Sequence, residues 1–152
     1  MRASVAVITS YGAGLLGSLF ISTTTGGWYD TLIKPEFSPP SWVYAPVWLV
    51  LYGLMAAAVT LIWNRDPNAT EWRGWVPMFF AHLLLNAAWA VFFFGFHTIL
   101  VAFVDIVILL FFIVLLIVGA WEIDKRAAYL LAPYLAWVLF ATVLNGAIWY
   151  LN

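Results

Sequence analysis

Charged side chains are scarce in this sequence. Asp, Glu, Lys and Arg make up 9% of its 152 residues, whereas hydrophobic residues make up 66%. A soluble domain of this length could not bury so many apolar side chains without exposing a hydrophobic surface to water. The composition therefore predicts an integral membrane protein that has the lipid bilayer as its solvent.

Cysteine is absent, and basic residues do not cluster. The first absence excludes disulfides, cysteine-ligated zinc and thiol nucleophiles. Nucleic acid binding needs a basic face, so a net charge of −1 without a Lys/Arg cluster argues against a nucleic-acid partner. The sequence also lacks a Ser/His/Asp arrangement, a metal-ligand cluster and a glycine-rich phosphate loop. We therefore expect no metal, no cofactor and neither hydrolytic nor nucleotide chemistry.

The intervals between charged residues have the lengths of membrane spans. Residues 3–29, 37–64 and 127–152 contain no charge, and the interval from Arg73 to Glu122 contains only Asp105. A bilayer core about 30 Å thick takes roughly 20 apolar residues per helix, so the longest interval holds two spans and each of the others holds one. We predict an all-α membrane protein, a single five-helix transmembrane bundle over residues 1–152. Its expected spans are about 4–23, 44–63, 75–94, 98–121 and 127–151.

Glycine and proline residues mark the breaks in this pattern. The first helix is expected to end at the Thr/Gly run of residues 23–27. Lys34-Pro35 and Pro39-Pro40 follow, so residues 24–43 are predicted to form an ordered surface loop rather than a regular helix. Pro77 is expected in the first turn of its helix, and Pro133 inside the last helix, where it should cause a kink.

Small residues recur at four-residue spacing in the first span, as Ala13 with Gly17 and Gly14 with Ser18. Such pairs let two helix backbones approach closely. They serve either packing within the bundle or a dimer face.

Positive charge is divided unequally between the two ends of the predicted bundle. Five of the six Lys and Arg residues fall at the end that holds the N-terminus, and only Lys34 falls at the other. The positive-inside rule then places the N-terminus in the cytoplasm, and the C-terminus and the 24–43 loop outside the cell (inner) membrane. Tryptophans near span ends should form an aromatic belt at the membrane surface: Trp63, Trp72, Trp75 and Trp121.

Three predicted helices carry aromatic and hydrogen-bonding side chains on one face. In the third span, His82, Asn86, Trp89 and Phe93 form a single stripe, at offsets of four, three and four residues. The second span contributes Trp48 and Tyr52, and the fifth contributes Trp137, Ala141, Leu144 and Asn145. These faces either line a site for a large, flat, mostly apolar ligand or fill the core of the bundle.

Asp105 is the one acidic residue inside a predicted span, where it must be paired, protonated or in contact with water. It is either a functional group or a hydrogen-bonding tie to a neighbouring helix, with Asn86, Asn145 and Tyr134 as candidate partners. For His82 we expect a hydrogen bond between helices, with axial ligation of a porphyrin metal as the alternative.

Several of these residues belong to a longer pattern. Residues 28–35 read WYDTLIKP, and Pro39-Pro40, Trp42, Pro46-Val47-Trp48 and Leu51-Tyr52 follow them. The later segments are Leu85-Asn86, Trp89, Phe93-Phe94-Gly95, Asp105, residues 133–137 (PYLAW), residues 140–142 (FAT) and Leu144-Asn145. In this order, and over nearly the whole chain, the pattern resembles the TspO/MBR family of tryptophan-rich sensory proteins, which includes the mitochondrial translocator proteins.

The resemblance implies a five-helix membrane receptor, often dimeric, that binds protoporphyrin IX, related tetrapyrroles, isoquinoline carboxamides and benzodiazepines. It also implies that the 24–43 loop is a lid over the ligand. The pocket residues that it implies are Tyr29, Trp48, Tyr52, Asn86, Trp89, Phe93, Trp137, Ala141 and Leu144. His82 and Asp105 complete the expected ligand-binding set.

Three alternatives to a receptor stay open. Some bacterial relatives are reported to degrade porphyrin in light, and in such an enzyme Trp48 and Trp137 would be the catalytic residues. A transporter is less favoured because the sequence has no internal repeat. A purely structural membrane protein is the last alternative.

Two departures from the family pattern bear on the ligand. His82 stands where several relatives carry Gln, which would change the polarity of the pocket. The chain reads Trp149-Tyr150-Leu151-Asn152 without the basic residue that a sterol-recognition pattern requires.

Overall fold

The structure is a computed structural model, and it describes residues 2–22, 27–65 and 71–152. The long helices are α1 (Arg2–Ser22), α3 (Tyr44–Trp63), α4 (Glu71–Ala90), α5 (Ile99–Ile123) and α6 (Lys125–Leu151). Shorter pieces are α2 (Trp28–Thr31), a 3₁₀ turn (Ser41–Val43) and a π-helical turn (Val91–Gly95). The described part of the chain contains no strand, which confirms the all-α prediction.

Within the described residues, four helical segments are long and apolar enough to cross a membrane. They are Ser41–Trp63, Arg73–Gly95, Ile99–Ile123 and Lys125–Leu151. Helix α1 is not among them, so the predicted count of five spans is not confirmed by this criterion.

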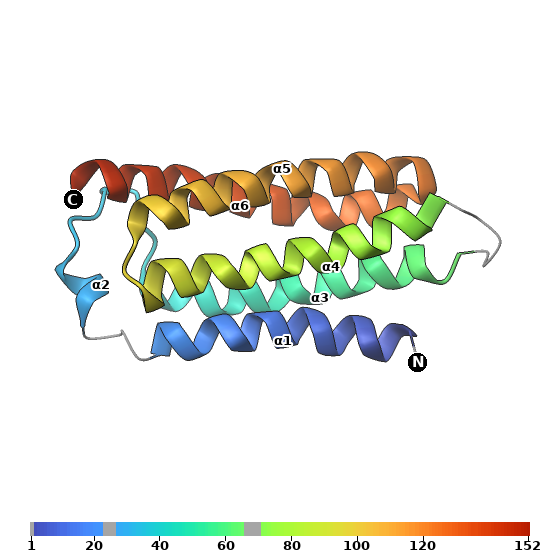
Figure 1. The fold of residues 1–152 in the computed structure, drawn as a ribbon, viewed down its shortest axis with the longest axis horizontal. Coiled ribbons are helices and arrows are strands. Elements are labelled where there is room, and N and C mark those ends of the chain that lie inside the picture. Colours follow the sequence, from blue (N-terminus) through green and yellow to red (C-terminus); the bar gives the residue numbers. More distant parts are fainter. Residues whose placement is uncertain (1, 23–26, 66–70) are drawn as a thin grey trace.

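The long helices pack in a closed ring. Helix α3 contacts α1 and α6, and α4 contacts α1 and α5, while α5 and α6 pack against each other. The cyclic order is therefore α1, α3, α6, α5, α4, and Figure 1 shows the helices running nearly side by side. Side chains that point inward from different helices can meet on the axis of this ring.

The two ends of the bundle differ in chemistry. At one end, which we call the basic end, Arg2 donates a hydrogen bond to the carbonyl of Trp63, and Arg65 pairs with Asp124. The other end, which we call the lid end, holds α2, the residues up to α3 and the C-terminus (Figure 1). Lys34 lies at this end, over the ring of Tyr29 at 4.5 Å from its centroid.

The observed helix boundaries follow the predicted ones, with one consequential difference. Helix α3 has the predicted bounds, and Pro46 lies in its first turn. Helix α4, however, begins at Glu71, four residues before the predicted start. Pro77 therefore lies inside α4 rather than in its first turn, as Pro133 lies inside α6. Most of the predicted break at residues 23–27 lies outside the described residues.

The lid loop (residues 24–43), described from residue 27 onward, is irregular except for α2 and the 3₁₀ turn. Several contacts attach it to the bundle, among them those of Trp28, Phe37 and Ile33. The Trp28 ring stacks on His97 at 4.3 Å, and Phe37 meets Phe140 edge-on at 6.4 Å. Asn152 holds Ile33, because its carboxamide donates to the Ile33 carbonyl at 3.0 Å and accepts from the Ile33 amide at 2.9 Å.

The predicted aromatic belt is wrong for Trp75. Its side chain is buried, and its indole donates a hydrogen bond to the Leu116 carbonyl at 2.8 Å. The early start of α4 explains this, because it places Trp75 one turn inside the helix. Trp121 is exposed and Trp63 half-buried, whereas the side chain of Trp72 lies outside the described part of the structure.

Candidate functional site

Three helices meet in a hydrogen-bonded network at the centre of the ring. Tyr52 of α3 donates to the carboxamide oxygen of Asn86 at 2.7 Å. The carboxamide nitrogen of Asn86, on α4, donates to the hydroxyl of Tyr134, on α6, at 3.1 Å. All three side chains are buried. We call Tyr52, Asn86 and Tyr134 the central network; it uses both ends of one carboxamide to satisfy two buried phenols.

The two tryptophans of the enzyme alternative both lie along the contact between α3 and α6. Trp48 stacks on Tyr52 at 5.4 Å and meets Tyr134 edge-on at 6.4 Å. Trp137 meets Tyr44 edge-on at 5.9 Å, which brings its ring to the next turn toward the lid end. Both indoles are half-buried against the core. Their neighbours are aromatic side chains that can themselves be oxidised.

A second group of aromatic side chains closes the lid end of the ring. Trp89 stacks on Phe93 at 5.4 Å, and Phe93 is met edge-on by Trp28 at 5.7 Å and by Tyr29 at 6.1 Å. Leu144 belongs to the same buried cluster. Phe93 lies in the π-helical turn, a rare conformation that is frequent at functional sites. The lid residue Tyr29 thus packs against the buried cluster that contains Phe93 and Leu144, two of the residues that the sequence placed in the pocket.

Asn145 ties this aromatic group to α5. Its carboxamide oxygen accepts a hydrogen bond from the Trp89 indole at 3.0 Å, and its nitrogen donates to the Ile99 carbonyl at 3.2 Å. The indole of Trp89 is therefore fixed in orientation, with its ring face against Phe93.

The expected hydrogen bond from Asp105 to a neighbouring helix, one of the two alternatives for this residue, is not found among the described residues. Asn86 and Asn145 are engaged elsewhere, and the buried oxygen Oδ2 of Asp105 has no hydrogen-bond partner among the described residues. The residue is 7% exposed. An unsatisfied buried acceptor of this kind calls for a donor, from a ligand or from water.

His82 is fully buried, and its expected hydrogen bond to another helix is not found in the described structure. Its Nδ1 faces the carbonyl of Phe79, one turn earlier on the same helix. A carbonyl can only accept, so Nδ1 carries the proton and Nε2 is left as an acceptor. Nε2 is buried without a partner, and the imidazole meets the ring of Tyr134 edge-on at 5.7 Å. His82 thus lies beside the central network without joining its hydrogen bonds.

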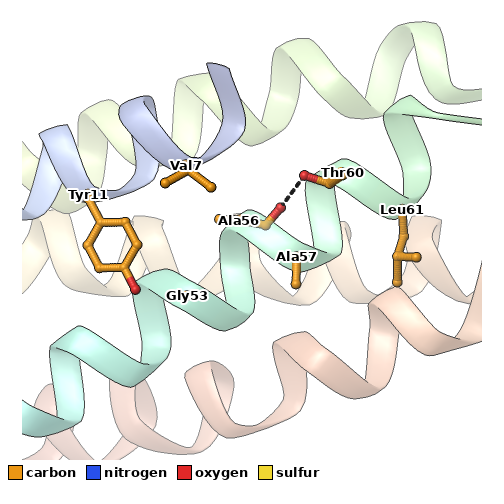
Figure 2. Close-up of a pocket in the computed structure, with 7 residues that line it drawn as sticks. All are labelled: Val7, Tyr11, Gly53, Ala56, Ala57, Thr60 and Leu61. Atoms are coloured by element: carbon orange, nitrogen blue, oxygen red, sulfur yellow. Dashed lines mark hydrogen bonds between the residues drawn. The ribbon is translucent and has the colours of Figure 1, made fainter. Parts of the chain in front are cut away.

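Two hollows are described on the bundle, and neither is lined by the expected pocket residues. A groove of about 470 Å³ between α1 and α3 is lined by Val7, Tyr11, Gly53, Ala56, Ala57, Thr60 and Leu61 (Figure 2). A smaller hollow of about 290 Å³ is lined by Trp75, Met78, Gly119, Glu122 and Ile123. Neither hollow includes Trp48 or Trp137, whose rings pack against Tyr52 and Tyr134 and against Tyr44 and Phe140, respectively.

Charge is concentrated at the basic end, away from these aromatic groups. Asp124 precedes α6 and accepts from the Arg126 amide at 3.0 Å, which caps the helix. Its Oδ2 also pairs with Arg126 at 2.9 Å and with Arg65 at 2.7 Å. These hydrogen bonds, those of Arg126 first, hold the pKa of the Asp124 carboxyl well below its usual range, although burial opposes them.

Sequence reasoning placed most of these residues on the right faces but missed part of the assembly. Tyr134 was considered only as a partner for Asp105, whereas it is one of the three members of the central network. Its spacing held the signal, because Tyr134 and Ala141 are seven residues apart and share a helix face. Trp28 and His97 were not assigned to the site at all. Their contact joins two connections that are distant in sequence, so no local pattern could indicate it.

Comparison with known proteins identifies the family. The TspO/MBR family matches over residues 5–151. The tryptophan-rich protein TspO of Chlorobaculum tepidum is 39% identical over 139 residues, which cover 91% of this chain and 88% of that protein. The tryptophan-rich protein TspO of Archaeoglobus fulgidus is 35% identical over 153 residues, 100% of this chain and 97% of that protein. The human translocator protein is 37% identical over 136 residues, 88% of this chain and 80% of that protein. This chain is therefore an integral membrane protein of the TspO/MBR family.

Proposed function

We propose that this protein is a membrane receptor or sensor for tetrapyrroles, with protoporphyrin IX as the ligand to test. The observation that carries the proposal is the aromatic enclosure at the lid end. There, Trp89 stacks on Phe93, the lid residue Tyr29 packs against Phe93, and Trp137 meets Tyr44 at the lid end of α3. A large planar apolar ligand gains most from stacking between such rings.

Two buried polar groups of the expected ligand-binding set lack a hydrogen-bond partner among the described residues. The carboxamides of Asn86 and Asn145 are occupied within the protein, whereas Asp105 Oδ2 and His82 Nε2 are acceptors without a partner in the described part of the chain. Unpaired acceptors favour a ligand that brings hydrogen-bond donors. Isoquinoline carboxamides and benzodiazepines would compete for the same aromatic surface.

We further propose that all five long helices span the membrane, with the basic end in the cytoplasm. Helix α1 has 21 residues, which at about 1.5 Å per residue matches a hydrocarbon core of about 30 Å. The basic residues gathered at one end support the orientation through the positive-inside rule.

Light-dependent degradation of the porphyrin is the second candidate. Trp48 and Trp137 support it, because each indole lies within 6 Å of a tyrosine ring, with centroid distances of 5.4 Å to Tyr52 and 5.9 Å to Tyr44. In this candidate an excited porphyrin and oxygen would generate the oxidant, and the two indoles would take part in its chemistry.

Titration of the purified protein with protoporphyrin IX, in darkness and in light, tests both candidates. Saturable quenching of tryptophan fluorescence in darkness supports the receptor, and loss of the porphyrin spectrum in light supports degradation. Trp48→Phe should alter both signals, whereas Trp121→Phe, on the exposed surface at the basic end, is the matched control. Absence of saturable binding would leave a structural role as the remaining alternative.

Ala141→Leu locates the pocket. Ala141 packs half-buried against the core on the helix of Trp137. Added volume in a packed place typically costs about 1–3 kcal/mol, and about 1.4 kcal/mol corresponds to a tenfold change in affinity. We expect porphyrin affinity to fall about tenfold or more. Unchanged affinity on folded protein would place the pocket elsewhere.

A further inference from the structure

Helix α1 packs against Tyr52 of the central network at Gly14. A Cβ atom placed on Gly14 would lie 2.3 Å from Cε2 of Tyr52, 2.8 Å from its Cδ2 and 2.9 Å from its Cζ. Contacts this short do not occur between real atoms, so the ring of Tyr52 occupies the space that any other residue at position 14 would fill. The small residue at this position therefore serves packing within the bundle.

The ring of Tyr52 has no room to move away from such a side chain. Trp48 stacks on one side at 5.4 Å, Tyr11 lies at 6.2 Å, and the hydroxyl is held by Asn86 at 2.7 Å. The side chain is also 8% exposed, and an aromatic ring is rigid beyond its two side-chain torsions. A substitution at Gly14 must therefore displace the ring, the hydrogen bond or α1 itself.

We infer that Gly14 is a positioning residue of the proposed ligand site. It holds Tyr52 where its hydroxyl orients Asn86 and its ring supports Trp48, although Gly14 itself lies on a helix that contributes no residue to the pocket. The inference rests on the proposed function for its effect on ligand affinity, but the placement of Tyr52 can be measured without any ligand.

Helix α1 offers two matched controls for this position. A Cβ on Gly12 would meet nothing within 4 Å, and one on Gly17 would meet only the Cβ of Ala90, at 3.2 Å. Gly→Ala in a helix interior removes the intrinsic penalty of glycine. Gly12→Ala should therefore leave the stability of the protein unchanged or raise it slightly. Gly17→Ala tests the effect of crowding α1 against Ala90, at a contact that does not involve Tyr52.

The first measurement is the dissociation constant of protoporphyrin IX in darkness. We expect Gly14→Ala to weaken binding about tenfold or more, since it overpacks a rigid site, and Gly12→Ala to change it less than about twofold. Equal affinities for the Gly14→Ala variant and the unmodified protein would overturn the inference, provided that the unmodified protein binds.

The second measurement needs no ligand. With 3-fluorotyrosine incorporated, the ¹⁹F resonance of Tyr52 is assigned by its loss in Tyr52→Phe. This resonance should shift in Gly14→Ala and stay in place in Gly12→Ala and Gly17→Ala. If the protein binds no porphyrin, the proposed function fails, whereas an unshifted Tyr52 resonance in Gly14→Ala defeats the positioning role by itself.

A double-mutant cycle separates positioning from general damage to α1. Gly14→Ala should lower the unfolding temperature when Tyr52 is present, but not in the Tyr52→Ala background, where the ring is gone. If Gly14→Ala alone does not fold, recovery of folded protein in the double variant supports the inference. Equal destabilisation in both backgrounds would show that Gly14 does not act through Tyr52.

Discussion

One carboxamide serves two buried phenols in this bundle, which makes the central network sensitive to the loss of a single atom. Tyr52→Phe removes the donor to Asn86 and leaves a buried carboxamide oxygen unsatisfied. Such an orphaned group costs about 1–3 kcal/mol, so we expect a loss of unfolding free energy of that order. Unfolding of the purified protein in detergent measures it, with Tyr129→Phe as control because Tyr129 is 64% exposed. Equal effects of the two substitutions would contradict a structural role for the hydroxyl.

Through its ion pairs at the basic end, Asp124 makes the free energy of unfolding depend on pH. Its pKa is lowered by Arg126 and Arg65, so its contribution is fully present above the ordinary carboxyl pKa of about 3.9 and is lost as the pH falls further. Asp124→Asn keeps a good helix cap but removes the charge. We expect the variant to be less stable near neutral pH and to lose less stability on acidification. Thermal unfolding from about pH 7 down to about pH 2 checks this, because the contribution is lost only below about pH 3.9, and parallel curves for the two proteins over that range would refute it.

At the scale of elements, the lid loop is fastened by a side chain from the far end of the chain. Asn152 brackets both backbone groups of Ile33 and also donates to the Ile148 carbonyl at 2.8 Å, which anchors it to α6. Asn152→Ala should leave global stability nearly unchanged, because the residue is exposed, but release residues 32–37. We expect faster amide exchange in that segment and a several-fold faster ligand dissociation rate. Tyr150→Ala, at a neighbouring position that is 86% exposed, is the control. If amide exchange in residues 32–37 stays slow in Asn152→Ala, the hydrogen bonds of Asn152 do not hold the lid loop in place.

Sequence reasoning placed some elements well and others poorly, for physical reasons. The bounds of α3 were predicted because Pro39-Pro40 stops any helix before it, and its apolar run ends at Asn64-Arg65. The start of α4 was misplaced because Glu71-Trp72-Arg73 is polar, and a polar turn that projects beyond the apolar layer looks like a loop. The same misplaced start led to the prediction that Trp75 lies at the membrane surface, whereas it is buried. Hydropathy locates the bilayer-embedded part of a helix, not its hydrogen-bonded ends.

At the scale of the whole molecule, the order of the helices around the bundle limits what the sequence could predict about the site. Periodicity shows which residues share a face of one helix, and it correctly grouped His82, Asn86 and Phe93 as buried. It does not show which helices are neighbours, since the order α1, α3, α6, α5, α4 differs from the order in sequence. The meeting of Tyr52, Asn86 and Tyr134, and the contact of Gly14 with Tyr52, follow from that order alone.

The absence of cysteine allows the proposed topology to be tested one position at a time. Ala3, Glu36 and Asn64 are exposed, so each can be replaced by a single cysteine and labelled with a membrane-impermeant thiol reagent in sealed cells or vesicles. We expect Glu36→Cys to react from outside, and Asn64→Cys only after the membrane is opened, because α3 connects these positions across the bilayer.

Ala3→Cys distinguishes five spans from four. If α1 crosses the membrane antiparallel to α3, Ala3→Cys is protected together with Asn64→Cys, consistent with the hydrogen bond from Arg2 to the Trp63 carbonyl at the same end. The physical reason is length: the 21 residues of α1 match a bilayer core of about 30 Å, and α1 packs beside α3, where Gly14 contacts Tyr52. Labelling of Ala3→Cys from outside, with Asn64→Cys protected, would show that α1 does not span the membrane. Labelling of Asn64→Cys from outside and protection of Glu36→Cys would reverse the orientation that the basic residues indicate.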